Sequence, residues 1–206
     1  KLNPPRKTAS VTAGDQPSGL SISHDGRWVA VANRKGRSVS LFEVKDQALI
    51  KRDEVDVDGE AAAVAMDPAG SKILVAKFAE HAVGIIDREG GTLRYDATKD
   101  LAVGRWPYNV QVVPGGVIAL VANNGNNGFP DGHVDTVSVV DLSVNPNRVI
   151  DHIVVGDGPE GLAVSPDGRL AVVTLLNGAA PLFKKDWFYH ETSQMAVLSI
   201  DGKTVE

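Results

Sequence analysis

Short apolar runs alternate with turn residues along the whole chain. Four segments share one pattern, a small apolar strand followed by a tight turn and a second apolar strand, and they close at Gly26, Gly70, Gly116 and Gly168. These glycines recur about every 45 to 50 residues, a period typical of solenoids and propellers. No long stretch has the 3.6-residue periodicity of an amphipathic helix. The pattern therefore predicts an all-β chain built from repeats.

Each repeat predicts four antiparallel strands. In the first repeat we expect them at residues 20–23, 28–32, 39–44 and 54–57. The Asp25-Gly26 pair between the first two strands is a hairpin signal. The fourth strand is the most polar, and in the second repeat we expect it within residues 93–103. Small inner strands and a polar outer strand favour blades arranged around a central axis, and hence a β-propeller.

The repeats divide the chain into one domain of four blades. The expected boundaries are an outer strand at residues 8–13 and blades at residues 14–57, 58–103, 104–155 and 156–206. Two interpretations of the blade count remain open. Either the chain is a fragment of a larger ring, which the position of both ends favours, or the strand at residues 8–12 completes the last blade and closes a four-bladed ring. An open ring exposes an apolar blade face, so a fragment should associate with itself or with the rest of the propeller.

Three phrases resemble the YVTN-type repeat of YncE-like and lactonase-like propellers, namely those at residues 159–169, 29–33 and 137–141. The Tyr-Val-Thr-Asn form itself survives only as Val-Ala-Asn at residues 31–33 and 121–123, and the WD40 signature is absent. The resemblance implies a seven-bladed ring and a periplasmic or secreted location. It also implies lactonase chemistry or a role as a subunit of a redox complex.

Composition excludes several classes of function. The 206 residues contain no cysteine, so disulfides, thiolate metal sites and a cysteine nucleophile are all excluded. The net charge of −5 argues against a nucleic-acid surface. No apolar run approaches the roughly 18 residues of a membrane span. Neither a nucleotide-binding loop nor a Cys-x-x-Cys-His haem motif occurs, so we expect no cofactor.

One face of the propeller is expected to collect the unusual residues. The loops entering each blade and the loops between second and third strands lie on the same side, and the latter are long at residues 123–135 and 176–194. Long loops on a rigid scaffold are frequently functional. We predict a ligand or partner surface there, formed by Trp106, Tyr108, Phe129, Trp187, Phe188, Tyr189 and His190. The alternative is that the aromatic loop covers the channel as a plug or forms a subunit contact.

A catalytic function would use the mouth of the channel on this same face. Glu160 follows the proline of its entry loop, and the equivalent positions in the other blades are Ser18, Ala62 and Tyr108. Lactone hydrolysis needs an acid or base and an electrophile directed at one carbonyl group. The residue types that meet this need are Glu160, His133, His190 and Arg105.

A metal site is the weaker possibility. Asp131, His133 and Asp135 have the side chains of metal ligands, but turn chemistry explains both aspartates. The Asn-Gly run before them lacks the spacing of an EF-hand loop, so we expect no metal. The resemblance to YncE-like propellers also implies single-stranded DNA binding, with bases stacked on Trp187, Phe188 and Tyr189 beside Lys184 and Lys185, although the acidic balance disfavours it.

These observations favour a non-catalytic binding or scaffold propeller that recognises a protein or a small molecule through the long-loop face. The alternative is a lactonase-like hydrolase whose site lies at the mouth of the channel.

Overall fold

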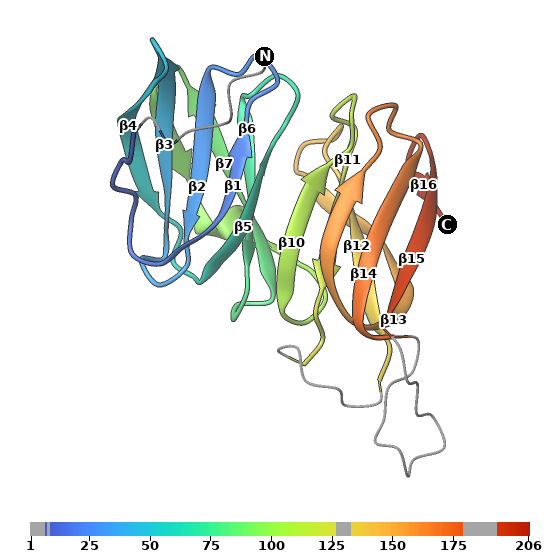
Figure 1. Ribbon diagram of the computed structural model, residues 1–206. Coiled ribbons are helices and arrows are strands. Elements are labelled where there is room, and N and C mark those ends of the chain that lie inside the picture. The colour runs from blue at the N-terminus through green and yellow to red at the C-terminus, as the bar shows by residue number, and fades with distance from the viewer. Residues whose placement is uncertain (1–6, 8, 127–132, 179–192) are drawn as a thin grey trace, which may run out of the picture.

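The computed structural model describes residue 7 and residues 9–126, 133–178 and 193–206. The strands in this part of the chain form four antiparallel blades in an open arc (Figure 1). Blade 1 consists of β1 (Pro17–Ile22), β2 (Trp28–Asn33), β3 (Ser38–Lys45) and β4 (Ala48–Asp56). Blade 2 consists of β5 (Ala61–Met66), β6 (Lys72–Lys77), β7 (Ala82–Glu89), β8 (Thr92–Tyr95), the 3-10 helix η1 (Ala97–Lys99) and β9 (Leu101–Ala102).

Blades 3 and 4 share one long strand. Blade 3 consists of β10 (Pro107–Val112), β11 (Ile118–Asn123), β12 (Asp135–Asp141) and the first half of β13 (Arg148–Val164). Blade 4 consists of the second half of β13, β14 (Leu170–Gly178), β15 (Gln194–Asp201) and β16 (Thr204–Val205). The predicted fold class, an all-β propeller of four-stranded blades, is confirmed.

The Asp-Gly turns of blades 1 and 4 join the first two strands of the blade in the same way. In blade 1 the Ser23 carbonyl accepts from the Gly26 amide at 2.8 Å, and the Ser23 hydroxyl donates to Asp25 at 2.6 Å. Gly26 has a φ of 70°, a conformation that costs glycine little and other residues more. The turn after β13 repeats this arrangement with Ser165 and Asp167. Turn chemistry read from the sequence therefore gives the first hairpin of a blade correctly.

Apolar side chains from facing blades fill the three interfaces of the arc. The interface between blades 1 and 2 contains Leu41, Val39, Ile73 and Ile86, all of them fully buried. Equivalent clusters join blade 2 to blade 3 and blade 3 to blade 4. Because each blade buries one sheet face against its neighbour, the core is distributed along the arc, as in other repeat folds.

The asparagine of the first Val-Ala-Asn phrase ties blade 1 to its entry loop, and both asparagines bond to serine hydroxyls of the third strand. The Asn33 amide donates to the hydroxyls of Ser38 and Ser40 at 3.0 and 2.9 Å, and its oxygen accepts from the Gly14 amide at 2.9 Å. Asn123 makes the corresponding bond to Ser138 at 2.8 Å in blade 3. The resemblance to the YVTN repeat thus reflects a polar clamp at the end of the second strand.

Blade 2 replaces this asparagine with Lys77. The Lys77 ammonium lies 2.6 Å from Asp100 and 3.1 Å from the Tyr95 hydroxyl, which donates to Asp100 at 2.6 Å. The Lys77 side chain is only 5% exposed. Burial and the nearby Asp100 carboxylate raise the pKa of Tyr95, so it remains a neutral donor. A buried, fully paired charge therefore sits between the strands of this blade.

Three expected strand features are wrong. Residues 9–13 form no strand, and the outer strand of blade 4 is β16, which pairs with Ile200 and Asp201 of β15; Thr8 lies outside the described residues. The expected strand within residues 93–103 is broken into β8, η1 and β9, because Asp96 caps η1 through the Thr98 amide at 3.1 Å. The expected boundary at residue 155 lies inside the continuous strand β13.

The arc leaves the outward faces of blades 1 and 4 uncovered by other described residues, at opposite ends of Figure 1. Leu20 is 65% exposed on β1, and Met195 and Val197 are 69% and 64% exposed on β15. The closed four-bladed ring considered above is therefore not formed. No helix in the described part of the chain has the length and apolar character needed to cross a membrane.

Asp141 predicts a dependence of stability on acid. Its carboxylate accepts from Lys203 at 2.7 Å and from the Ser143 hydroxyl at 2.7 Å, and the Lys203 bond contributes most to lowering its pKa to about 2. Because the folded pKa lies below the unfolded value of about 3.9, this contribution is complete above about pH 4 and is lost as the pH falls toward 2. The urea midpoint of Asp141→Asn should therefore approach that of the unmodified protein between pH 4 and pH 2. Equal pH slopes would contradict this, and Asp46→Asn in the exposed β3–β4 turn is the control.

Candidate functional site

The entry loops and the ends of the second strands meet on one face of the arc. The same backbone hydrogen bond recurs in three blades, from the residue after the second strand to a carbonyl of the entry loop: Arg34 to Gln16 at 2.9 Å, Phe78 to Glu60 at 2.8 Å, and Asn124 to Trp106 at 2.8 Å. The predicted placement of these two sets of loops on one side is confirmed. This side is called the mouth below.

A β-bulge at the start of each innermost strand presents one residue at the mouth. The register shifts across Ser18 in β1, Ala62 in β5, Tyr108 in β10 and Glu160 in β13. A bulge leaves its extra residue unpaired and turns the side chain away from the regular alternation, which is why bulges are frequent beside active sites. The equivalence of these four positions, inferred from the repeat, is confirmed.

The innermost strands enclose a small cavity of about 210 Å³ below the mouth. It is lined by Ser18, Ala62 and Tyr108 from the bulges and by Arg34 from the end of β2. The Ser18 hydroxyl donates to the carbonyls of Ala61 and Ala62 at 2.9 and 2.8 Å, so it is committed to structure. The other polar side chains that line the cavity are Arg34, Tyr108, Asn109 and Gln111, and Glu160 lies outside this lining.

Arg34 reaches from blade 1 to blade 2. Its guanidinium lies 4.2 Å from the centre of the Phe78 ring and 3.0 Å from the Glu60 carboxylate. Phe78 is only 3% exposed, so the cation lies against a desolvated aromatic face. The arrangement holds a positive charge at the mouth in one orientation.

Phe78 continues the contact from blade 2 to blade 3. Its ring centre lies 4.9 Å from that of Trp106 and 5.9 Å from that of Tyr108. His81 packs edge-on against Trp106 at 4.9 Å, and its Nδ1 accepts from the Trp106 amide at 3.1 Å. The result is an aromatic wall at the mouth, of which Tyr108 is the exposed member.

Trp106 adopts a strained backbone conformation to take part in this wall. Its φ is 55°, in the left-handed region, where Gly158 stands at the equivalent position of blade 4 with a φ of 70°. Bulky residues rarely adopt such a φ, and strain of this kind clusters at functional sites. The buried Trp106 Nε1 also has no hydrogen-bond partner among the described residues. A similar left-handed φ of 52° occurs at Gln16, the equivalent position of blade 1, so this conformation belongs to the entry-loop turn of the repeat.

Asn124 completes the series by joining blade 3 to Glu160 in blade 4. Its amide nitrogen donates to the Glu160 Oε1 at 3.2 Å, and Asn124 itself is 1% exposed. Burial raises the pKa of the Glu160 carboxyl above its ordinary value, while the hydrogen bond from Asn124 offsets part of this increase. The Asn124 oxygen has no partner within the described part of the chain. Glu160 is thus a half-buried, oriented carboxylate that can accept a proton more readily than an exposed one.

The predicted catalytic residues differ in where the structure places them. Glu160 lies at the mouth as expected. Arg105 is exposed on the entry loop of blade 3, where its carbonyl accepts from the Gly125 amide at 3.1 Å, and His133 is exposed before β12. His190 lies outside the described residues, as do Phe129, Trp187, Phe188 and Tyr189 of the predicted binding surface and Asp131 of the metal candidates.

Asp135 has a structural role in the described part of the chain. Its carboxylate accepts from the Gly158 amide at 2.9 Å and so joins β12 to the entry loop of blade 4. No group of three or more potential metal-binding side chains occurs among the described residues. The metal candidates therefore gain no support from the geometry.

Sequence reasoning missed four residues of the mouth. Arg34, Phe78 and Asn124 share one repeat position, the residue after the second strand, and His81 supports Trp106. Aligning the repeats at the end of the second strand, in addition to its start, would have identified the first three. No pattern in the sequence marks His81.

Comparison with known proteins matches part of the chain to a family. Residues 4–111 match the model of the family described as Lactonase, 7-bladed beta-propeller. A search of curated protein sequences finds no significant match. Among solved structures, hydrazine synthase from Kuenenia stuttgartiensis is 25% identical over 84% of this chain and 46% of its own, with a TM-score of 0.66.

Two further structures share the fold at lower identity. A functionally unknown protein from Desulfotomaculum acetoxidans is 16% identical, with a TM-score of 0.77 over 100% of this chain and 59% of its own. A periplasmic gluconolactonase from Pseudomonas aeruginosa is 19% identical, with a TM-score of 0.68 over 95% of this chain and 57% of its own. The chain spans about half the length of the structures it matches.

Proposed function

Because the chain belongs to the lactonase family of seven-bladed β-propellers, we propose that it hydrolyses a lactone at the mouth, with Glu160 as the general base. The family membership supports this lactonase alternative over the non-catalytic binding protein that the sequence favoured. A periplasmic location accompanies the proposal, since one structure of the same fold is a periplasmic gluconolactonase.

The observation that carries the proposal is the position of the Glu160 carboxylate together with its raised pKa. A bulge presents its carboxylate at the mouth, Asn124 fixes one carboxylate oxygen at 3.2 Å, and burial raises its pKa. A general base works best when its pKa is raised toward the pH at which it operates. Glu160 is therefore suited to take a proton from water.

The reaction balances with water as the second substrate. Glu160 accepts a proton from a water molecule, whose oxygen forms a bond to the lactone carbonyl carbon. The bond between that carbon and the ring oxygen then breaks, and the ring oxygen takes up the proton from Glu160. The product is a single hydroxy acid, and Glu160 returns to its starting state.

The remaining residues of the mouth have supporting roles in this proposal. The Arg34 guanidinium, held against Phe78, supplies positive charge for the oxygen that becomes negative during attack. Tyr108 and Trp106 offer aromatic surface for the substrate ring. Asn124 positions Glu160 and is a positioning residue.

The test is the hydrolysis of a panel of five- and six-membered lactones, followed by acid release from pH 5 to pH 8. We expect a rate that rises with pH through a midpoint above the ordinary glutamate pKa and then reaches a plateau. Arg34→Met should lower kcat about 10- to 100-fold, because one charged donor to the developing oxyanion is lost. Lys35→Met, at the exposed neighbouring position, is the matched control.

Two results would contradict the proposal. One is that no lactone is opened with or without divalent metal ions. The other is saturable binding of lactones without turnover, which would return the protein to the binding class that the sequence favoured.

A further inference from the structure

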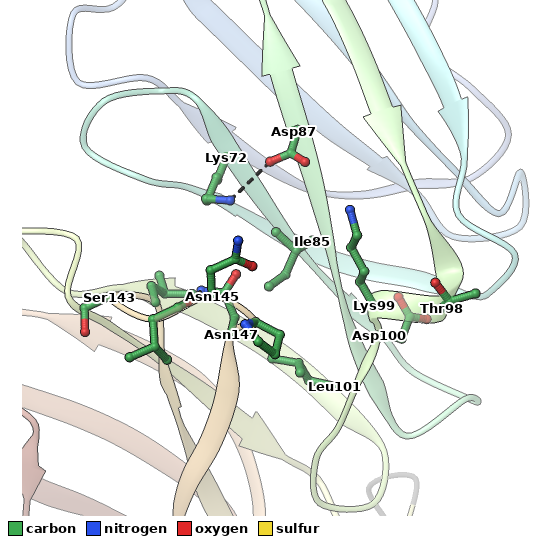
Figure 2. A pocket seen from close by; sticks show the side chains of 13 residues that line it. Lys72, Ile85, Asp87, Thr98, Lys99, Asp100, Leu101, Ser143, Asn145 and Asn147 are labelled. Atoms are coloured by element: carbon green, nitrogen blue, oxygen red, sulfur yellow. Dashed lines mark hydrogen bonds and ion pairs between the residues drawn. The ribbon is translucent and has the colours of Figure 1, made fainter.

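A second cavity lies away from the mouth, on the outer rim between blades 2 and 3 (Figure 2). Its volume is about 630 Å³, within the roughly 300–1,000 Å³ range of small-molecule sites. One wall comes from β7, η1 and β9, and the other comes from the turn between β12 and β13. None of the mouth residues lines it. This cavity is called the rim groove below.

The broken outer strand of blade 2 creates the rim groove. In blade 1, β4 pairs with β3 from Ser38 to Lys45. In blade 2, β8 pairs with β7 only at residues 86–89 and β9 only at residues 82–83. Gly84 and Ile85 therefore have no ladder partner on their outer side among the described residues, and the Asp96–Asp100 segment bends away from them. The groove is thus specific to this blade.

Both walls of the rim groove are fixed by internal hydrogen bonds. On the blade 2 side, Asp100 is held by Lys77 and Tyr95, each at 2.6 Å. On the blade 3 side, the Asn147 amide donates to the Val144 carbonyl at 2.9 Å, and the Ser143 amide donates to Asp141 at 3.0 Å. Preformed walls reduce the entropy lost when a ligand binds.

The rim groove has an apolar floor. Ile85 lies at its centre, and Leu101, Leu142, Val144 and Pro146 complete the apolar lining. Figure 2 shows Ile85 between Asn145 on one side and Lys99 on the other. An apolar surface with a few polar groups at its edge is the usual form of a site for a small organic molecule.

The charges of the rim groove are balanced, and Lys99 is the cation that an anion can reach most readily. Asp100 is neutralised by the buried Lys77, and Lys72 is paired with Asp87 at 3.2 Å. Lys99 is held least firmly: its ammonium lies 3.7 Å from Asp96, and its side chain is 65% exposed. A ligand carboxylate can therefore compete for Lys99 without breaking a buried pair.

We propose that the rim groove binds a small organic carboxylate, with its apolar body over Ile85 and its carboxylate at Lys99. The inference is independent of the proposed hydrolysis, since it uses no residue of the mouth.

The test uses hexanoate as the probe, with hexanamide as its uncharged counterpart, and follows backbone amide chemical shifts. Hexanoate should shift residues 84–85, 99–101 and 142–147, and hexanamide should bind at least fivefold more weakly. Lys99→Gln should weaken hexanoate binding about five- to tenfold while leaving hexanamide unchanged, since one charge-assisted contact is lost. Lys45→Gln, an exposed lysine at the end of β3, is the control and should change neither.

The outcomes separate the alternatives. Equal affinity for hexanoate and hexanamide, or unchanged hexanoate affinity in Lys99→Gln, would overturn the role of charge. Shifts confined to the mouth, or no shifts up to millimolar concentration, would overturn the site itself.

Discussion

Replacement of Glu160 by glutamine is expected to lower kcat for lactone opening by about 10²- to 10⁴-fold, the usual contribution of general base catalysis. Glutamine keeps the length of the side chain and an oxygen that can accept the bond from Asn124. It has no basic carboxylate, so water is no longer deprotonated during attack. KM should change little, because the substrate contacts assigned to Tyr108 and Trp106 remain. The measurement is steady-state acid release on the lactone that the protein hydrolyses best.

The pH profile distinguishes loss of the base from general damage. In the unmodified protein the rate should rise with pH as Glu160 loses its proton, at a pH above the ordinary glutamate value because burial raises its pKa. Glu160→Gln should lack that rise in its residual rate. Glu89→Gln, at the exposed end of β7, should keep both rate and profile. An unaltered kcat in Glu160→Gln would remove Glu160 from the mechanism.

Replacement of Asp100 by alanine is expected to destabilise the fold by about 3–5 kcal/mol, the usual cost of leaving one member of a buried ion pair uncompensated. Lys77 would keep its charge in a position where its side chain is only 5% exposed. Its remaining partner, the Tyr95 hydroxyl at 3.1 Å, cannot neutralise that charge. Urea unfolding at neutral pH gives the free-energy difference.

A comparison between a buried and an exposed ion pair tests whether the uncompensated buried charge causes the loss of stability. Glu89 and Arg94 lie 3.9 Å apart, and both side chains are more than 70% exposed. Removing the Glu89 carboxylate with Glu89→Ala should therefore cost less than about 1 kcal/mol. Adding Lys77→Met to Asp100→Ala should recover part of the lost stability, because the buried charge disappears. If the double variant were less stable than Asp100→Ala, the uncompensated charge would not be the cause.

The blade pattern was accessible from sequence because it depends on local rules. Alternating apolar strands and a turn that ends in glycine recur in every repeat, with Asp-Gly itself at residues 25–26 and 167–168, and the position of Glu160 in its repeat followed from the same alignment. A bulge at a fixed repeat position then brings this residue to the mouth in each blade. Fold class and one site residue could therefore be inferred without coordinates.

The partners of Glu160 could not be inferred in this way. Asn124 reaches Glu160 across a blade boundary, and Arg34 reaches Phe78 in the same manner. Such contacts depend on how far neighbouring sheets are offset and twisted, and the spacing of residues within a repeat carries no information on either. Sequence reasoning instead favoured Arg105, which lies in the right loop but is exposed there.

The outer strands were the least predictable elements. Their polar residues suit a strand edge, a capped turn or a loop almost equally. The conformation therefore depends on which local hydrogen bonds form. In blade 2, Asp96 bonds to Thr98 and diverts the chain into η1, and the rim groove is the result. The segment at residues 9–13 has strand-like residues but forms no strand, although β16 pairs with only the last residues of β15.

Because the strand β13 is continuous, blades 3 and 4 can be duplicated, deleted or exchanged only as one unit. It forms the outer edge of blade 3 and the inner edge of blade 4 without an intervening loop, from Arg148 to Val164. Duplicating, deleting or grafting blade 4 alone would cut through a hydrogen-bonded strand and separate Glu160 from Asn124. Modular engineering should therefore exchange blades 3 and 4 as one cassette, with the joints placed before β10 and after β16.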